Sequence, residues 1–437
     1  RTGGPGPVSD VVRIGMLGCG TVGQGVVRIL HETAGTIERA TGHRLEITRV
    51  LVRDAQADRP GLDPSVLTTD VEDILGDDRI DVIIEVMGGV DPTHEWLVRA
   101  LGHGTSVVTA NKQLLARFGP ELLAAAEEGG SEIRFESSVC AAIPVIKVLR
   151  ESLLAAEIES VMGIVNGTTN YILSEMRRSG MSYADALAQA QDLGYAEADP
   201  TEDVGGADAA AKMAILSSIA FHTRVLIDDV PYTGIDELQS DDVDIAHELG
   251  FVMKLLGIAR LADGAVSVRV HPALVPGDHP LASVNGADNA VLLESSLVRQ
   301  IMLEGPGAGG TETASAVVGD VLSILGSRPG SFLGGALADA GRPMAAEGAL
   351  ESAFYLRLEV ADRPGVLARI SAVLGECGVS ILTVLQRGEG ESARLVMILH
   401  RGPESQVQVA LGRLRDMAEV RDEPVLITVV GSGEAPA

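Results

Sequence analysis

Residues 11–23 read VVRIGMLGCGTVG, an apolar run that ends in a glycine-rich turn. The run predicts a buried parallel strand, and a helical stretch follows it to about residue 40. Three more apolar runs, at residues 46–52, 80–86 and 106–109, predict short strands with helical segments between them. Strand–helix–strand repeats of this kind give a right-handed, doubly wound parallel sheet, so the fold class is α/β.

The glycine turn itself indicates a ligand. Gly18 permits the tight turn, Gly20 lets the backbone approach a pyrophosphate, and Gly23 allows close packing of the helix. Thr21 and Val22 open that helix, whose N-terminal amides are available to an anion. In this strand–turn–helix setting, the motif favours a nucleotide site in a Rossmann-like domain over a bare packing turn.

Composition narrows the classes of partner. The chain has 437 residues, of which 46% are hydrophobic and 22% charged, and its net charge is -27 from 34 basic and 61 acidic residues. Such a balance repels phosphate backbones and anionic lipid, so we expect no nucleic-acid and no membrane partner. We also expect no membrane-spanning helix, because no apolar run reaches 18 residues. We expect no signal peptide, because the sequence does not start with a basic segment followed by an apolar one.

The three cysteines, Cys19, Cys140 and Cys377, are scattered and show neither a disulfide framework nor zinc spacing. This favours a reducing, cytoplasmic location. Cys19 lies in the glycine turn, where a small filler is a better explanation than a redox group.

Composition shifts along the chain predict its domains. Residues 1–10 and 326–352 are rich in Gly and Pro or Ala, which is typical of a flexible lead-in and a linker. The expected organisation is a lead-in (1–10), a nucleotide domain (11–142), a middle domain mixing strands with Ala-rich helices (143–304), a glycine turn and small-residue helix (305–325), the linker (326–352) and a small α+β domain (353–430).

The end of the second predicted strand, Val52-Arg53-Asp54, bears on nucleotide choice. An acidic residue there usually bonds the 2′-hydroxyl of NAD, whereas an arginine can fork onto the 2′-phosphate of NADP. Arg53 therefore favours NADP(H), and Asp54 keeps NAD(H) open. An exposed arginine that simply caps the strand is the alternative.

The most informative stretch is residues 190–212, AQDLGYAEADPTEDVGGADAAAK. Asp208 and Lys212 are four apart on its last helix and so share one face. A solvated ion pair would be the plain explanation. However, the rest of that helix is small and apolar, which favours a buried pair with a polar ligand beside it.

This stretch resembles the signature of the homoserine dehydrogenase family. Ten positions fall in register: Ala190, Gly194, Tyr195, Asp199, Pro200, Asp203, Val204, Gly206, Asp208 and Lys212. The resemblance runs from about residue 11 to residue 325, and it includes Thr109-Ala110-Asn111-Lys112 and Asn166-Gly-Thr-Thr-Asn170.

The resemblance implies NAD(P)-dependent, reversible conversion of L-aspartate 4-semialdehyde to L-homoserine, in the biosynthesis of threonine, methionine and isoleucine. Hydride arriving at an aldehyde carbon leaves an alkoxide, which needs a proton and nearby positive charge. By this likeness Lys212 is the acid, Asp208 orients it, and Lys112 serves the reaction, the substrate or the cofactor. Glu197 pairs with the substrate ammonium group.

Further family positions complete the expected sites. Tyr195 and Asp203 are expected beside the substrate, Asp203 more as a capping residue than as a reacting group. Thr109 and Gly305 join the cofactor site, and residues 305–325 are expected to complete the nucleotide domain. The middle domain would be catalytic and dimerising.

The segment Glu136-Ser-Ser-Val139-Cys-Ala141-Ala-Ile143-Pro resembles the family's monovalent-cation loop. The resemblance implies that one carboxylate, from Glu136, and the carbonyls of Val139, Ala141 and Ile143 bind Na⁺. From the residues alone, an ordinary strand-to-helix turn is the preferred explanation.

Residues 354–430 open with FYLRLEVADRPGVLARISAVLGECGVSI and resemble an ACT domain, a βαββαβ amino-acid-sensing module. Pro364 and Gly365 form a turn, and the helix that follows has free amides for a carboxylate. The implied effector is L-threonine, and such domains pair, so we expect a homo-oligomer, either a dimer or a tetramer. A dimerisation domain without a ligand is the alternative.

Two other functions were weighed. Another Rossmann-type amino-acid or semialdehyde dehydrogenase would share the first 120 residues but has no reason to carry the 190–212 segment. A non-catalytic amino-acid sensor would be expected to lack Lys212, Asp208 or Glu197, and all three are present. With ten residues ahead of the first strand, we expect no fused kinase.

Overall fold

The computed structural model describes residues 10–326, 344, 346, 348, 351–388 and 391–430. Nearly all of the expected lead-in and most of the expected linker lie outside these residues. The chain divides into two compact units. One holds the residues up to Val161, then Ala210–Val230 and the stretch from Asn289, and the other holds Met162–Ala209, Pro231–Asp288 and the C-terminal part of the chain.

The first unit is built on a six-stranded sheet in the order β3-β2-β1-β4-β5-β6, and its strands are parallel. This is the strand order of a Rossmann domain, so the predicted fold class is confirmed. The strands are β1 (Asp10–Leu17), β2 (His43–Leu51), β3 (Leu67–Thr68), β4 (Val82–Glu85), β5 (Ser106–Thr109) and β6 (Ile133–Arg134). β10 (Asp288–Ser295) and β11 (Arg299–Pro306) neighbour each other outside this sheet.

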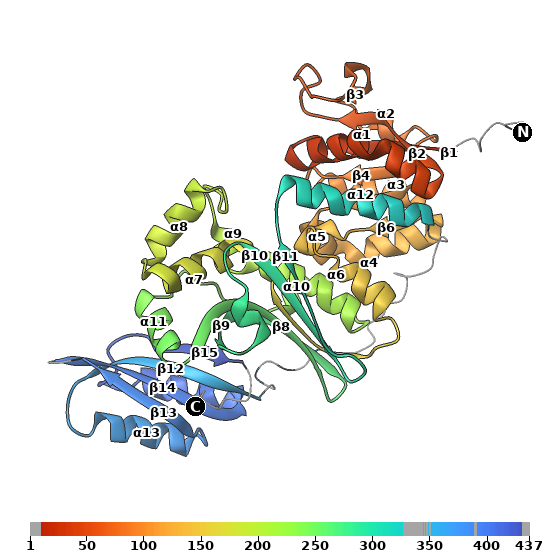
Figure 1. Ribbon diagram of the computed structural model, residues 1–437. Coiled ribbons are helices and arrows are strands. Elements are labelled where there is room, and N and C mark those ends of the chain that lie inside the picture. Colours follow the sequence, from red (N-terminus) through yellow and green to blue (C-terminus); the bar gives the residue numbers. More distant parts are fainter. Residues whose placement is uncertain are drawn as a thin grey trace, which may run out of the picture. The chain divides into compact units, whose positions relative to one another are not determined.

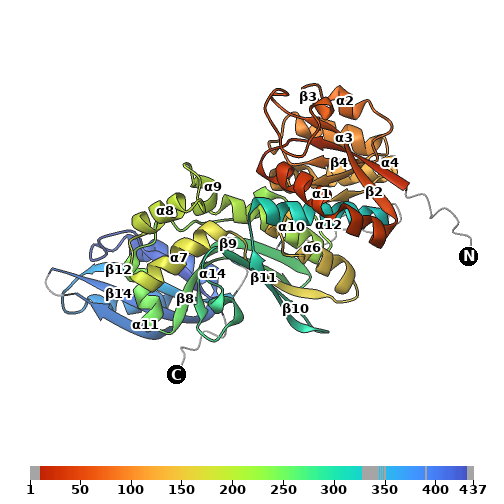
Figure 2. The same ribbon diagram turned by 45° about the horizontal axis from the view of Figure 1, so that its top comes forward.

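Helices cover the parallel sheet because its strands are apolar on both faces. The helices of this unit are α1 (Thr21–Thr41), α2 (Glu72–Leu75), α3 (Thr93–Gly102), α4 (Lys112–Gly129), α5 (Ser137–Cys140), α6 (Val145–Lys147) and α12 (Gly310–Gly326). α12 comes nearly 270 residues after α1, yet the two pack side by side (Figure 2). A Cβ on Gly25 of α1 would lie 2.8 Å from the Cβ of Ala314, so this close approach requires glycine.

The second unit carries most of the remaining strands, which are hydrogen-bonded in the order β7-β8-β9-β15-β12-β14-β13. Their bounds are β7 (Ile158–Ile164), β8 (Phe251–Ala262), β9 (Ala265–Pro276), β12 (Glu351–Ala361), β13 (Ile381–Arg387), β14 (Ser392–Pro403) and β15 (Val425–Val429). Its helices are α7 (Gly167–Ser179), α8 (Tyr183–Asp192), α9 (Thr201–Val204), α11 (Ser240–Glu248), α13 (Val366–Glu376) and α14 (Glu404–Arg415), while α10 (Ala207–Ala220) runs from this unit into the first (Figure 1). Over the described residues, no helix combines the length and apolar character needed to cross a membrane.

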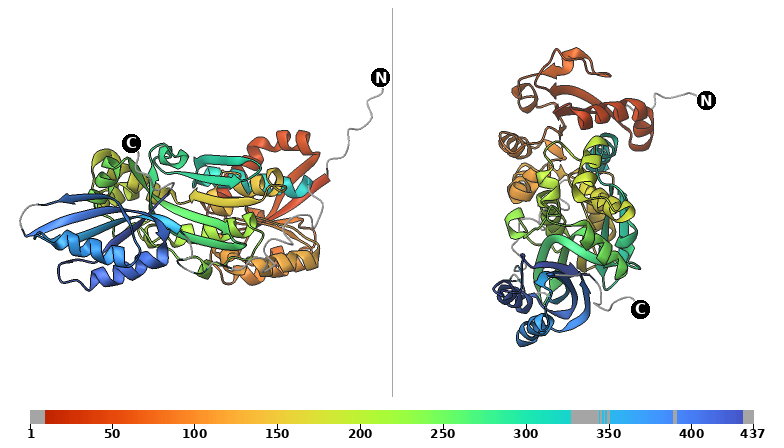
Figure 3. Two further views of the ribbon diagram at one scale, coloured as in Figure 1. Left: turned by 90° about the horizontal axis from the view of Figure 1, so that it is seen from below. Right: turned by 90° about the vertical axis from the view of Figure 1, so that its left-hand side faces the viewer.

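The elements from β12 to β15 follow the βαββαβ order expected of an ACT domain. The two helices lie together against these strands (blue in Figure 3), where Ile370 and Leu374 of α13 pack with Leu411 and Leu414 of α14 in one apolar core. β15 also pairs in parallel with β9, through Thr428 and Val429. The ACT domain is therefore joined to β8 and β9 as one continuous sheet.

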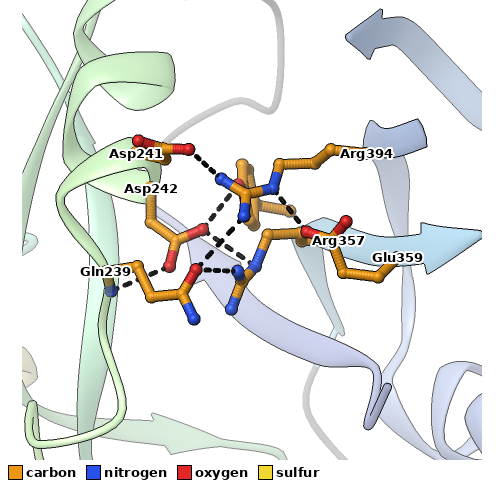
Figure 4. Close-up of polar contacts among 7 residues, drawn as sticks. Gln239, Asp241, Asp242, Arg357, Glu359 and Arg394 are labelled. Carbon is orange, nitrogen blue, oxygen red and sulfur yellow. Dashed lines mark hydrogen bonds and ion pairs between the residues drawn. The ribbon is translucent and has the colours of Figure 1, made fainter. Parts of the chain in front are cut away.

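Polar contacts also join the ACT domain to α11, and we call this group the α11 junction (Figure 4). Asp242 of α11 is fully buried, and its Oδ1 lies 2.9 Å from Nε of Arg357 on β12. Tyr355 donates its hydroxyl to the same carboxylate at 3.1 Å, and Arg357 donates through Nη1 to the side-chain oxygen of Gln239 at 2.7 Å. The remaining members are Asp241, Glu359 and Arg394, which form a more exposed chain of ion pairs.

Candidate active site

The glycine turn lies where the strand order of the parallel sheet reverses, between β1 and β4. Ligands of doubly wound sheets bind at this point, beyond the carboxyl ends of the strands. Gly18 has φ +96°, and a Cβ there would lie 2.8 Å from the Cβ of Met87. Nothing lies within 4 Å of a Cβ on Gly20, whereas one on Gly23 would meet the Gly18 carbonyl at 2.9 Å. The three glycines thus have the three environments that the motif predicts.

A cleft of about 650 Å³ opens beside this turn. Arg53, just beyond β2, is exposed and lines it, together with the half-buried Trp96. A second cation, Arg59, also lines the cleft, and its guanidinium donates to the carbonyls of Asp54 and Ala57 at 2.8 and 3.0 Å. The sequence analysis did not single out Arg59, because it lies in an irregular loop with no motif around it.

Burial governs the chemistry of Cys19 in the same cleft. Its pKa is raised, chiefly by desolvation, although a hydrogen bond from Gln24 and the charge of Arg59 oppose the rise. A thiol held in its neutral form is a weak nucleophile. This agrees with the expectation that Cys19 is a filler.

The loop after β4, which lines the cleft, is fixed by a buried carboxylate that was not predicted from the sequence. Glu85 accepts hydrogen bonds from the amides of Met87 and Gly88 at 2.9 and 3.0 Å, and from the hydroxyl of Thr109 at 2.6 Å. Burial raises its pKa, and these donors counteract the rise. Thr109 itself is fully buried, so its hydroxyl serves the loop. An acidic residue at the end of the otherwise apolar strand VIIE was the signal in the sequence.

Lys112 is the first residue of α4 and is half-buried. Its neighbour Asn111 caps the helix by accepting the amide of Leu114 at 3.1 Å, and it donates to the carbonyl of Gly89 at 2.6 Å. Asn111 therefore ties the start of α4 to the loop after β4. The backbone of Lys112 is fixed beside that loop.

In the second unit, one amide organises two of the predicted carboxylates. Asn166 donates through Nδ2 to Asp203 at 2.7 Å and to Asp208 at 2.8 Å. Its Oδ1 accepts the amide and the hydroxyl of Thr169 at 2.9 and 3.0 Å, which fixes its orientation at the start of α7. Thr168 also donates to Asp203, at 3.3 Å. Because both amide protons are used, Asn166 holds the two carboxylates at a set separation.

The predicted pair lies on α10 as expected from its spacing. Asp208, 3% exposed, and Lys212, half-buried, are one turn apart on a helix whose apolar side chains from Ala209 onward are buried. α10 begins directly after Gly206, whose φ of +92° needs glycine. This setting argues against a solvated surface pair.

The other predicted substrate residues lie on the loop before α9. Glu197 is exposed, and its carbonyl accepts a hydrogen bond from Gln191 at 3.0 Å. Tyr195 is 47% exposed, with its ring centre 4.9 Å from that of Tyr171. Thr168 donates to the Tyr195 carbonyl at 2.5 Å. This loop is thus tied to the same α7 start that holds Asp203 and Asp208.

The predicted cation loop contains a buried pair of carboxylates. Glu136 accepts the amides of Ile146 and Lys147 at 2.7 and 2.8 Å, and its own amide donates to Asp320 of α12 at 2.8 Å. Burial, reinforced by Asp320, raises the pKa of Glu136 to about 8, and burial raises that of Asp320 to about 7. Asp320 was missed from the sequence, although it is the one acid in the apolar run TASAVVGDVLSIL. Ala141 has φ +45° and turns the loop.

Comparison with known families places each part of this arrangement. The family model for the homoserine dehydrogenase NAD-binding domain matches residues 18–136, and that for homoserine dehydrogenase matches residues 144–322. The ACT-domain model matches residues 354–419. The predicted ACT domain is therefore confirmed.

Whole proteins give the same result. A homoserine dehydrogenase of Corynebacterium glutamicum is 43% identical over 92% of this chain and 92% of its own, and one of Bacillus subtilis is 40% identical over 97% and 99%. The crystal structure of a homoserine dehydrogenase from Thiobacillus denitrificans, 40% identical, superposes with a TM-score of 0.90 over 96% of this chain and 98% of that one. A hyperthermophilic archaeal homoserine dehydrogenase in complex with NADPH, 29% identical, has a TM-score of 0.62 over 72% and 97%.

The glycine turn, the Asn166-anchored carboxylates and Lys212 thus stand in a chain that matches these enzymes over almost its whole length, and the protein belongs to the homoserine dehydrogenase family of oxidoreductases.

Proposed function

We propose that this chain catalyses the reversible, NAD(P)-dependent reduction of L-aspartate 4-semialdehyde to L-homoserine. The observation that carries the proposal is the Asn166 amide, which orders Asp203 and Asp208 at the start of the helix that bears Lys212. The purified protein should oxidise NADPH or NADH on addition of aspartate semialdehyde and reduce the oxidised cofactor on addition of homoserine. Absence of turnover with both substrates would remove the proposal.

The chemistry follows from the charges of these side chains. The nicotinamide cofactor, when bound, supplies the hydride that reaches the aldehyde carbon. The Lys212 ammonium stabilises the developing alkoxide and donates a proton to that oxygen. Asp208 keeps Lys212 oriented. In this proposal Glu197 pairs with the substrate ammonium, Lys112 pairs with the substrate carboxylate, and Tyr195 also contacts the substrate.

Asn166 tests the positioning role. Asn166→Ala should lower kcat/KM by roughly 10- to 100-fold, because Asp203 and Asp208 each lose a hydrogen bond from the Asn166 amide. Hydrogen bonds to charged acceptors are stronger than those between neutral groups. Steady-state rates with homoserine measure the effect. Asn285→Ala serves as a control, because Asn285 is an exposed asparagine of the same unit whose side chain is hydrogen-bonded to Arg177 and to the carbonyl of Ser283. Equal, near-normal rates for both variants would show that Asn166 only caps α7.

For the cofactor we propose a preference for NADP(H), with Gly18, Gly20, Thr21, Val22 and Gly23 at the pyrophosphate. The exposed side chain of Arg53 lines the cleft and supports this, since it carries positive charge where the ribose is expected. Thr109 and Gly305 would approach the cofactor by their backbone, because the Thr109 hydroxyl is bonded to Glu85 and glycine has no side chain.

Arg53→Gln should raise KM for NADPH by about tenfold or more and leave KM for NADH nearly unchanged, because one charge-assisted phosphate contact is lost. Arg79→Gln, an exposed arginine of the same unit paired with Asp77, should change neither value. Initial rates with each cofactor measure the split. A parallel rise in both KM values would mean that Arg53 does not contact the 2′-phosphate.

We further propose that a monovalent cation, Na⁺, binds at Glu136 and the carbonyls of Val139, Ala141 and Ile143. The buried Glu136–Asp320 pair fits this group, because two carboxylates away from water are stabilised by a nearby cation. The oxygen-only ligand set also suits a hard ion.

The thermal midpoint should be higher in NaCl than in tetramethylammonium chloride at equal ionic strength, because Na⁺ would bind only the folded chain. Glu136→Gln should abolish the difference. A Na⁺ effect that persists in this variant would place the cation elsewhere.

Regulation and assembly complete the proposal. We propose that L-threonine is the effector of the ACT domain, that the chain forms a dimer or tetramer, and that it acts in the cytoplasm. Deletion of the ACT domain is a poor test, because it would strip β15 from β9 and the partners from Asp242. Point variants are sharper, and they are described next.

A further inference from the structure

A second cavity, of about 210 Å³, lies in the second unit where the ACT domain joins β8 and β9. We call it the arginine cavity, because Arg260, Arg269 and Arg401 line it with Glu351, Ser352 and Thr428. Three cationic side chains converge here in a chain whose net charge is -27. Neither the glycine cleft nor the Asn166 group contains any of these residues.

The register of the strands explains the convergence. Arg269 of β9 pairs with Ile258 of β8, and Arg260 lies two residues further along β8. The side chains of Ile258, Arg260 and Arg269 therefore share one face of the sheet. Arg269 is mostly buried, and the charge of Arg260 helps to lower its pKa below the usual range, after burial itself. The charge of Glu404 raises that pKa and opposes the effect of Arg260, and a ligand carboxylate beside the two arginines would act in the same direction as Glu404.

The hydrogen bonds of Arg269 leave part of it available. Its Nη1 donates to Glu404 at 2.6 Å and its Nη2 to Ser352 at 2.9 Å. Its Nε is buried and has no hydrogen-bond partner among the described residues. A buried donor without an acceptor is costly, so this atom indicates a missing acceptor.

The lining of the arginine cavity also includes a negative group. Glu351 lies 3.8 Å from Arg401, a loose pair in which both side chains are more than half exposed. It is thus placed to receive an ammonium group, while Ser352 and Thr428 offer hydroxyls. The volume equals that of about seven water molecules, which is the scale of a small amino acid.

We infer that the arginine cavity binds a small free α-amino acid as its zwitterion, with the carboxylate at Arg260 and Arg269 and the ammonium at Glu351. The walls come from both β8–β9 and the ACT strands β12, β14 and β15, so an occupant contacts the two parts at once. An effector that contacts both parts can favour one arrangement of them over another. The inference rests on the proposed amino-acid regulation and locates its site.

The test uses the full-length protein and calorimetric titration with L-threonine, L-serine, L-alanine and inorganic phosphate. Arg260→Gln should weaken amino-acid binding by about tenfold or more, because a charge-assisted contact with the ligand carboxylate is lost. Arg269 is left intact, since it also holds Glu404 and Ser352. Arg413→Gln, on α14 and paired with Glu376 outside the cavity, is the matched control and should bind normally.

A further variant separates this site from the ACT turn. Leu367→Glu puts a negative charge on the exposed first turn of α13, where it would repel a carboxylate bound at that helix start. Amino-acid binding that survives Leu367→Glu and is lost in Arg260→Gln supports the arginine cavity. Binding lost in Leu367→Glu and unchanged in Arg260→Gln would overturn it and leave threonine regulation standing.

The remaining outcomes also decide. Binding of serine or alanine that depends on Arg260, without binding of threonine, supports the cavity and removes threonine as the effector. Binding of phosphate alone, or no binding of any amino acid at millimolar concentration, would overturn the assignment. Initial rates measured in parallel show whether catalysis itself is intact.

Discussion

Replacement of Lys212 with alanine should lower kcat by roughly two to four orders of magnitude, the usual contribution of a positioned acid–base group. The alkoxide that forms on hydride transfer would lose both its proton donor and the positive charge beside it. KM for homoserine should change far less, because the proposed contacts of Glu197 and Lys112 remain. Single-turnover rates of NADPH oxidation measure the chemical step.

The fold should tolerate this change. Lys212 lies in a run of small residues on α10, and alanine is a strong helix former, so the thermal midpoint should stay near that of the unchanged protein. Arg79→Ala is a control, because Arg79 is an exposed cation paired with Asp77 and has no proposed contact with the substrate. Near-normal turnover of Lys212→Ala, or a loss equal to that of the control, would assign the acid to another group.

Local patterns were enough to predict the parallel sheet and the cofactor turn. The glycine spacing has a steric basis at each position, and those constraints act within a few residues. The ACT domain could be predicted for a similar reason, since its strand, Pro-Gly turn and amphipathic helix are contiguous. The predicted strands at 46–52 and 80–86 overlap the observed β2 and β4 but differ at their ends, where fraying makes boundaries weak signals.

Contacts between residues far apart in the sequence could not be predicted. Asn166 contacts Asp203 and Asp208 across some 40 residues, and Asp320 meets Glu136 across 184. Arg59 lines the cleft only because an irregular loop folds back beside Gly18. In each case the side chain is unremarkable in its own segment, and its function depends on long-range packing that no local period encodes.

The second large effect concerns stability and the α11 junction. Asp242→Ala should lower the free energy of unfolding of the second unit by about 3–5 kcal/mol, because it leaves the Arg357 guanidinium buried without its counter-charge. Burial raises the pKa of Asp242, and Arg357 is the largest of the groups that oppose the rise. The pair is therefore mutually dependent: each charge is tolerated in the interior because the other is present.

Two comparisons separate this explanation from a general loss of packing. Asp241→Asn removes an acid one residue away whose side chain is 64% exposed, and it should cost no more than about 1 kcal/mol. The double change Asp242→Leu with Arg357→Met removes both charges and should recover most of the loss, since apolar replacement of a buried pair is often neutral. Urea denaturation, with hydrogen exchange of β12 to locate the effect, measures all three. If Asp242→Ala cost no more than Asp241→Asn, the buried pair would contribute little, and the attachment of the ACT domain would depend on the β9–β15 pairing instead.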